Sequence, residues 1–128
     1  MKSRSLGRTD LRLSEITQGT WGLASGAYGP VRAERFDQTL RAALDAGVTA
    51  FDCAPVWGDG EERVGRLLEE AKSDALVITR GGARRVDGKL QQSFDKDALI
   101  RDCDASLARL GRETIDLWLL HNPGDATI

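Results

Sequence analysis

The sequence predicts an α/β fold in which short apolar strands alternate with amphipathic helices, in the order βαβαβαβ. Two observations carry this prediction. Short runs rich in β-branched and apolar residues recur along the chain, and most lack the two-residue alternation of strands with one solvated face. The segments between these runs have the apolar spacing of helices, and the connections that lead from strand to helix are the longer ones and contain glycine.

The four expected strands lie near residues 16–21, 48–52, 76–80 and 115–120. The last three are mostly apolar, as expected of parallel strands that are covered on both faces. Ahead of the first strand, the segment at about 5–14 predicts a small hairpin with its turn at Gly7 to Asp10.

Three segments have the periodicity of amphipathic helices, at about 33–46, 60–71 and 96–110. Their apolar stripes are Phe36, Leu40, Ala43 and Leu44; Val64, Leu67, Leu68 and Ala71; and Leu99, Cys103, Leu107 and Leu110. Gly47 is expected just beyond the end of the first helix, where glycine is the favoured residue. Asp59 is the expected N-cap of the second helix.

The pattern leaves two arrangements of the helices open. Crossovers between neighbouring parallel strands are almost always right-handed. Helices on one face would accompany a sheet that curls toward a barrel, whereas helices on both faces would make a doubly wound sheet. In either case residues 1–128 are expected to form a single domain.

Composition excludes several classes of protein. Hydrophobic residues make up 41% of the chain, which is enough for a core and too much for a disordered tail. The formal net charge is −2 and no block of basic residues occurs, so a nucleic-acid partner is not expected. The longest apolar run, Leu117 to Leu120, is too short to span a membrane. A cytoplasmic chain is therefore expected, and the isolated Cys53 and Cys103 indicate neither a disulfide framework nor a metal site.

Three ionisable residues stand at the ends of successive expected strands: Asp52, Arg80 and His121. Because the carboxyl ends of parallel strands about 4.8 Å apart meet at one edge, we expect these side chains to lie together there. Asp52 and Arg80 would pair, and the cation would keep His121 neutral. Each residue alone could be a cap or a loop anchor, but the three together favour a functional site.

Other candidates carry weaker signals. Gly58-Asp59-Gly60 with Gly65 has the composition of a phosphate loop, although its spacing favours a turn and a helix start. Arg84-Arg85 could bind phosphate, although a solvated pair in a loop is the favoured interpretation. The aromatic residues Trp21, Tyr28 and Trp57 fall in or beside strand-to-helix loops, where they are expected to wall an apolar pocket. Trp118 lies on a strand and is expected in the core.

Several motifs resemble the aldo-keto reductase family, in its order and at its spacing, from one end of the chain to the other. The motifs are Leu6-Gly-Arg-Thr-Asp-Leu11, Gly19-Thr-Trp21, Phe51-Asp-Cys-Ala54, Trp57-Gly-Asp-Gly60, Ser106-Leu-Ala-Arg-Leu-Gly111, Ile115-Asp-Leu117 and His121-Asn-Pro123. The resemblance implies a (β/α)₈ TIM barrel with an N-terminal hairpin at its bottom. It also implies hydride transfer between NADPH and a small carbonyl substrate, without a metal.

The family uses a catalytic tetrad of Asp, Tyr, Lys and His. The resemblance implies that Asp52 and His121 take the Asp and His positions, while Trp57 stands where the family has Tyr and Arg80 where it has Lys. It places the nicotinamide beside Gly19, Thr20, Trp21 and Asp52, and the substrate pocket beside Trp21, Tyr28, Trp57 and His121.

These two departures change the expected chemistry. The indole of Trp57 can donate a hydrogen bond but cannot release its proton in a useful pH range, and loss of a general acid costs about 10²- to 10⁴-fold in rate. Arg80 keeps the positive charge and can bind Asp52 through two hydrogen bonds. Two substitute acids are a protonated His121, which Arg80 opposes, and Tyr28 swinging over the mouth of the barrel.

Length is a third departure, because a complete barrel of this kind needs about 250 residues. Half a barrel would leave its first and fourth strands as open edges, so we expect self-association or pairing with a missing C-terminal half, with Ile115 to Leu120 as the pairing edge. The leading interpretation is the N-terminal part of an NAD(P)H-dependent reductase that is inactive in isolation. The alternatives are a non-catalytic barrel that binds a ligand or partner, and a purely structural domain.

Overall fold

A parallel sheet with the strand order β3-β4-β5-β8 forms the centre of the molecule. The structure, a computed structural model, describes residues 1–24 and 26–124. Its elements are β1 (Ser3–Ser5), β2 (Arg12–Ser14), β3 (Gln18–Gly19), α1 (Trp21–Ala24), α2 (Ala33–Asp45), β4 (Ala50–Asp52), α3 (Gly60–Ala71), β5 (Leu76–Gly81), β6 (Ala83–Val86), β7 (Lys89–Gln92), α4 (Lys96–Leu110) and β8 (Leu117–Leu120).

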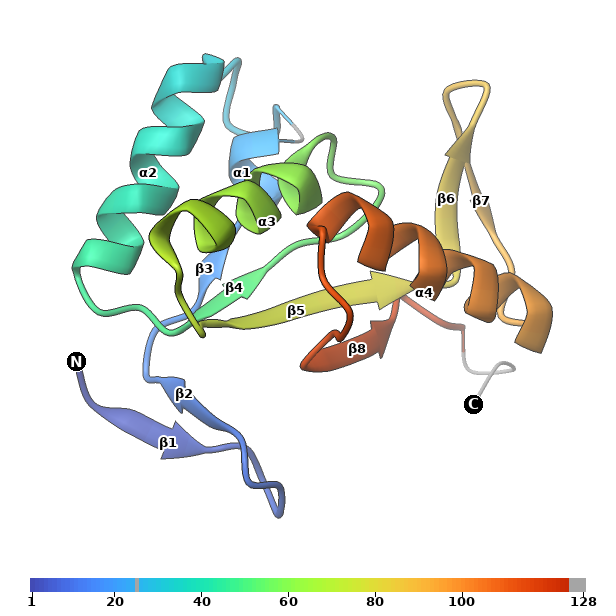
Figure 1. The fold of residues 1–128 in the computed structure, drawn as a ribbon. Helices are drawn as coiled ribbons and strands as arrows, with labels where there is room; N and C mark the ends of the chain where they lie inside the picture. The colour runs from blue at the N-terminus through green and yellow to red at the C-terminus, as the bar shows by residue number, and fades with distance from the viewer. Residues whose placement is uncertain (25, 125–128) are drawn as a thin grey trace.

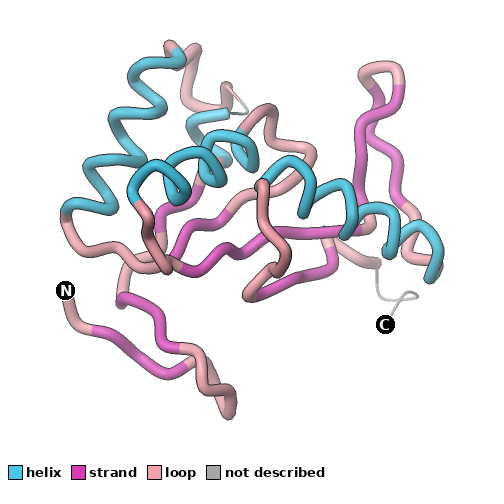
Figure 2. Tube along the Cα trace, in the orientation of Figure 1, coloured by secondary structure: helices cyan, strands magenta, loops and turns pink. Residues whose placement is uncertain are grey.

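Helices α2, α3 and α4 lie on the same side of this sheet (Figures 1 and 2). This decides between the two arrangements that the sequence left open, because a doubly wound sheet would carry helices on both faces. Strands that follow one another in the sequence are also neighbours in the sheet, each parallel to the next. The architecture is that of a partial barrel, and the antiparallel hairpin β1–β2 precedes it in the sequence.

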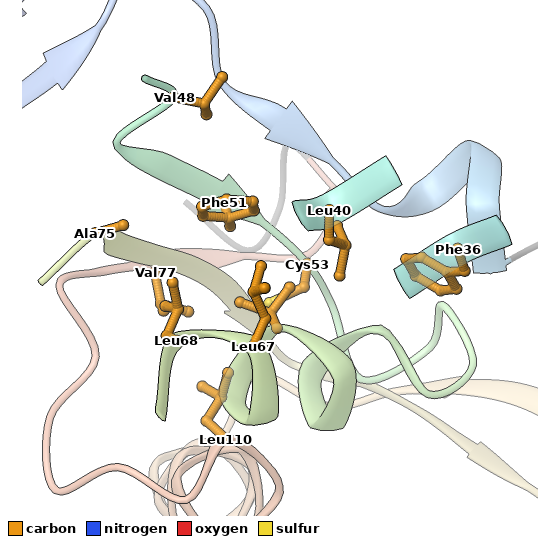
Figure 3. Close-up of a cluster of buried hydrophobic side chains, with 11 residues drawn as sticks. Phe36, Leu40, Val48, Phe51, Cys53, Leu67, Leu68, Ala75, Val77 and Leu110 are labelled. Atoms are coloured by element: carbon orange, nitrogen blue, oxygen red, sulfur yellow. The ribbon is translucent and has the colours of Figure 1, made fainter. Parts of the chain in front are cut away.

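The apolar core fills the space between the sheet and the helices (Figure 3). Phe51 of β4 and Val77 of β5 are fully buried there, against Leu40 of α2 and Leu68 of α3. Because side chains alternate between the two faces of a strand, residues one step along from these point to the opposite face. Asp52, next to Phe51, is one of them.

The strands are in register at the level of the expected site. Gly19 pairs with Asp52, Asp52 pairs with Ile78, and Ile78 pairs with Leu117, so the four strands finish at the same edge of the sheet. Each observed strand overlaps its predicted range, although β3 is only two residues long. It is short because the chain turns into α1 at Trp21, which the sequence analysis placed on the strand.

The predicted helices agree with the observed ones to within one residue. Gly47 has φ +86° and lies beyond the end of α2, as expected. Asp59 occupies the predicted N-cap position of α3, but its side chain does not cap the helix. Its carboxylate accepts a hydrogen bond from Arg63 Nε at 2.8 Å instead of one from a backbone N–H of the helix. The observed side-chain cap is Asp95, which accepts from the N–H of Ala98 at 2.9 Å at the start of α4.

The sequence analysis missed the hairpin β6–β7, which rises from the end of β5 beside α4 (Figure 1). Its turn is Asp87-Gly88, where both residues have positive φ, of +50° and +75°. Asp-Gly is the preferred pair for such a tight turn because Asp tolerates, and Gly freely adopts, the left-handed conformation. Arg84 and Arg85 therefore belong to a strand rather than to a loop.

Candidate functional site

Asp52 and Arg80 form the centre of the candidate site. Arg80 Nη1 lies 2.5 Å from Asp52 Oδ1, and Nη2 lies 3.1 Å from Oδ2. The same Nη1 donates a hydrogen bond to the carbonyl of Cys53 at 3.1 Å. Asp52 ends β4 and pairs with Ile78 of β5. Arg80 lies two residues beyond Ile78 on β5, on the same face of the sheet, so its long side chain reaches the Asp52 carboxylate.

Trp57 covers the guanidinium of Arg80. The Arg80 Cζ lies 4.6 Å from the centre of the indole, in the range of a cation–π contact. Trp57 lies in the turn after β4, where its backbone N–H donates a hydrogen bond to the carbonyl of Ala54 at 3.0 Å. The indole also packs against a small apolar cluster of Ala54, Val56 and Ala83.

His121 completes the group. Its ring meets the edge of Trp57, with centroids 5.8 Å apart and planes at 72°. Its backbone N–H donates to the carbonyl of Gly81 at 2.9 Å, which continues the pairing of β8 with β5. The residue is 7% exposed, and its Nδ1 is buried with no hydrogen-bond partner among the residues that the structure describes. Burial lowers the pKa of His121 below 6.5, the Arg80 charge lowers it further, and Asp52 opposes both effects.

The four residues that the resemblance assigns to the tetrad therefore form one connected group: Asp52, Trp57, Arg80 and His121. The expected neutral state of His121 agrees with the lowered pKa. Most of the positive charge of Arg80 is balanced by Asp52, so the site presents a paired guanidinium and two aromatic rings rather than a free cation. The indole and the guanidinium can donate hydrogen bonds to a polarised oxygen but cannot release a proton in a useful pH range.

The other predicted pocket and cofactor residues lie in different environments. Trp21 and Tyr28 contact each other edge to face, with centroids 5.6 Å apart, and are 45% and 82% exposed. Gly19 is exposed at the end of β3. Thr20 is fully buried, and a Cβ built on Gly60 would lie 2.8 Å from its hydroxyl oxygen. The Thr20 hydroxyl therefore faces the start of α3 and is closed off from any ligand at the rim.

The glycine-rich segment is a turn and a helix start, not a phosphate loop. Gly58 has φ +66°, as a turn glycine does, and Gly60 begins α3. Gly65 serves helix packing, because a Cβ there would lie 2.2 Å from the carbonyl oxygen of Leu110 in α4. Arg84 and Arg85 lie on β6, with the Arg85 guanidinium donating to the carbonyl of Gly88 in the same hairpin.

Two surface hollows lie away from the group. One, of about 460 Å³, runs between α2 and α3 and is lined mostly by charged residues such as Asp37, Arg41 and Arg66. The other, of about 530 Å³, is apolar and is lined by Phe94, Lys96, Leu99, Ile100, Cys103 and Trp118. Trp118 is thus half-buried beside α4 rather than fully enclosed in the core.

The two cysteines differ in burial, since Cys53 is buried and Cys103 is partly exposed. Cys53 and Cys103 are both free, and burial together with the nearby Glu61 charge raises the pKa of the Cys53 thiol to about 12. A thiol of this kind is not a nucleophile near neutral pH. Within residues 1–24 and 26–124, no cluster of His, Cys, Asp and Glu could hold a metal ion. No helix of the described part of the chain has the length and apolar character needed to cross a bilayer.

The sequence analysis missed one residue that contacts the group, Gln92. Its side-chain amide donates to the carbonyls of His121, at 2.9 Å, and Asn122, at 3.2 Å. A polar residue in an unrecognised hairpin gives no sequence signal of this role. The only available clue was Asp87-Gly88, which predicts the hairpin turn.

The sequence pattern of the Aldo/keto reductase family matches residues 15–127 of the chain. Among curated proteins, aldo-keto reductase YhdN of Bacillus subtilis is 33% identical over 96% of this chain and 38% of its own length. L-glyceraldehyde 3-phosphate reductase of Escherichia coli is 35% identical over 99% of this chain and again 38% of its own length. The chain thus spans about two fifths of the curated relatives that it matches.

Solved structures agree with these relatives. The glycerol dehydrogenase AKR11B4 of Gluconobacter oxydans superposes with a TM-score of 0.83 at 33% identity, over 97% of this chain and 40% of that protein. The holo form of aldo-keto reductase AKR11C1 from Bacillus halodurans also gives a TM-score of 0.83, at 28% identity, over all of this chain and 44% of that protein. The predicted fold, the N-terminal part of a TIM barrel, is confirmed. The chain belongs to the aldo/keto reductase family.

Proposed function

We propose that this chain is the N-terminal part of an oxidoreductase that uses NADPH or NADH to reduce a small aldehyde or ketone. One observation carries the proposal: the residues at the four tetrad positions contact one another at the carboxyl end of the sheet. Activity in parallel α/β barrels resides at this end. A purely structural domain has no need of a part-buried ion pair, a cation–π contact and a buried imidazole at the same rim.

Only two of the four residues expected beside the nicotinamide are accessible to it. Gly19 and the ring of Trp21 are exposed and could lie against it, and the cofactor when bound would supply the hydride. Thr20 is fully buried, and both Asp52 oxygens are bound to Arg80. These two residues would therefore support the site from behind. The remaining cofactor contacts would come from parts of the barrel that these 128 residues do not include.

The four residues of the site lack an evident acid to protonate the carbonyl oxygen. Reduction of a carbonyl adds a hydride to carbon and a proton to oxygen, and the proton needs an acid. Trp57 can hold the oxygen through its indole N–H but cannot release that proton. Burial and the Arg80 charge lower the pKa of His121, which disfavours the protonated form that an acid needs. We therefore expect the residues of this chain to bind and polarise a carbonyl and to protonate it poorly, by about 10²- to 10⁴-fold relative to a site with a matched acid.

The second candidate function is a non-catalytic barrel that binds a ligand or a partner protein. Trp57 and Arg80 favour it, since together they replace a proton donor and the residue that would activate it. One relative, 30% identical over 99% of this chain, is named as a probable voltage-gated potassium channel subunit beta of Oryza sativa. That name describes a channel subunit and not an enzyme activity.

Oxidation of NADPH in the presence of small aldehydes tests the two candidates in the complete chain. The variants are Trp57→Tyr combined with Arg80→Lys, which creates the family's own pair, and His121→Ala. Arg84→Lys, outside the group, is the matched control. Activity of the unmodified protein that His121→Ala abolishes would establish the enzyme. Activity that appears only in the double variant would establish the non-catalytic barrel.

A further inference from the structure

The hairpin β6–β7 contacts the candidate site through both of its strands. On β6, Ala83 is 1% exposed and belongs to the apolar cluster of Ala54 and Val56 against which Trp57 packs. The partner of Ala83 in the hairpin is Gln92 of β7. One end of the hairpin thus supports the indole on one strand and contacts the histidine segment on the other.

Gln92 fixes the segment that carries His121. Its Nε2 lies 2.9 Å from the carbonyl oxygen of His121 and 3.2 Å from that of Asn122. Asn122 has φ +50°, a left-handed conformation that costs energy for a residue with a side chain. The Gln92 amide, which both carbonyls share, stabilises this turn. The last hydrogen bond between β8 and β5 runs from the His121 N–H to the Gly81 carbonyl, and Gln92 holds the backbone just beyond it.

The base of the hairpin is itself anchored. Gly82, which joins β5 to β6, donates its N–H to the Asp102 carboxylate of α4 at 2.8 Å. Its carbonyl accepts from the N–H of Ser93 at 3.1 Å, which closes the hairpin. With φ +86°, and with the Phe94 ring 2.3 Å from a Cβ built there, this position admits only glycine without rearrangement. The base of the hairpin is therefore fixed by hydrogen bonds to α4 and between its own two strands.

We propose that the hairpin β6–β7 sets the position of the Trp57 and His121 rings relative to each other, and that Gln92 is the positioning residue for His121. The inference rests on contacts within this chain and holds whether the barrel is an enzyme or a binding protein. Gln92 acts on the backbone that presents the imidazole.

His121 is the only histidine of the chain, so its ring protons give a single set of NMR signals that reports on this site alone. Gln92→Met keeps the length of the side chain and removes the donor, and Gln92→Glu places an acceptor there. Gln91→Met is the matched control, because the neighbouring side chain of the same strand points to the other face.

In both Gln92 variants we expect the His121 ring signals to move toward those of an unstructured histidine, as contact with the indole edge is lost. The His121 backbone amide should exchange with solvent about 2- to 10-fold faster, as expected for the loss of a net hydrogen bond. Gln91→Met should leave both measurements unchanged. Ring signals and exchange that match the unmodified chain in Gln92→Met would overturn the proposal, as would equal changes in Gln91→Met.

Circular dichroism separates repositioning from unfolding. Gln92 is exposed, so both variants are expected to keep the secondary structure of the unmodified chain. If Gln92→Met unfolds, Gln92→Lys, which restores an N–H donor at similar reach, must return the ring signals to their original positions. Failure of that rescue would also overturn the proposal.

Discussion

Arg80 binds both carboxylate oxygens of Asp52, with Nη1 2.5 Å from Oδ1 and Nη2 3.1 Å from Oδ2. Both side chains are mostly enclosed, at 21% and 23% exposure. A planar guanidinium matches the two oxygens of a carboxylate, whereas the ammonium of a lysine would act as a point charge. Arginine at this position therefore makes a more fixed pair than lysine would, and Trp57 stacks on its flat face.

Arg80→Lys should destabilise the chain by about 1–2 kcal/mol, since one charge-assisted hydrogen bond and the stacking on Trp57 are lost. Urea denaturation of the variant and the unmodified chain measures the difference. Arg84→Lys is the control, because Arg84 is 42% exposed and lies 4.0 Å from Asp102. It should change stability by less than about 0.5 kcal/mol. Equal effects of the two substitutions would show that the paired geometry is unimportant.

A second ion pair joins α3, α4 and β5 behind the site. Glu61 is 1% exposed; one oxygen accepts from Thr79 at 2.6 Å and the other from Arg109 at 2.5 Å. Arg109→Met would leave a buried carboxylate without its partner, which costs about 3 kcal/mol or more. Glu61→Gln combined with Arg109→Met should recover part of this loss. The experiment is a double-mutant cycle by chemical denaturation.

The exposed pair Arg41–Glu70, at 3.2 Å, is the natural comparison for this cycle. Its side chains are 43% and 57% exposed, so Arg41→Met should cost less than about 1 kcal/mol. A loss as large as that of Arg109→Met would mean that burial of Glu61 does not determine the energetics.

Much of this fold follows from local rules that act within one segment. Phe36 and Leu40 recur at helical spacing, and both are buried in the core where α2 packs on the sheet. Gly47 ends its helix because a left-handed residue is needed there. At the start of α3 the predicted residue occupies the N-cap position, but its side chain does not cap the helix. Asp59 has a competing partner in Arg63, and a tertiary choice of this kind leaves no trace in the local sequence.

The candidate site divides in the same way. That Asp52 and Arg80 meet could be predicted, because parallel strands in register finish at one edge of the sheet. The contacts of Trp57 with Arg80 and His121 depend on side-chain packing in a loop, which the pattern does not specify. The role of Gln92 was hidden because it requires a hairpin to fold back onto the histidine segment.

Stability should depend on pH through His121. Burial and the Arg80 charge hold the pKa of His121 in the folded chain below its ordinary value of 6.5. Between the folded-state pKa and 6.5, the unfolded chain therefore binds more protons than the folded chain. The free energy of unfolding is therefore expected to fall as the pH is lowered through 6.5 toward the folded-state pKa. Urea denaturation at about pH 7.5 and about pH 5.5 measures this loss. His121→Gln should reduce the difference between the two pH values, and an unchanged difference would assign it to other groups.

The edge of the sheet formed by β8 should mediate association. Leu119 and Leu120 are 37% and 40% exposed, and in the described residues β8 pairs only with β5. An unpaired apolar edge of this kind favours pairing with another strand, from a second copy or from the remainder of a barrel. Sedimentation of the 128-residue chain should show species larger than a monomer, and Leu119→Lys should shift them toward the monomer. A monomer at all concentrations would contradict this expectation.

The most direct test of a single site at the carboxyl end of the sheet is the NMR titration of His121 in the unmodified chain, in Arg80→Gln and in Arg84→Gln. We predict a pKa below 6.5 in the unmodified chain and in Arg84→Gln. It should rise in Arg80→Gln, because the cation is removed and Asp52 loses its partner. A His121 pKa at or above 6.5 that does not respond to Arg80→Gln would show that these residues do not share one site.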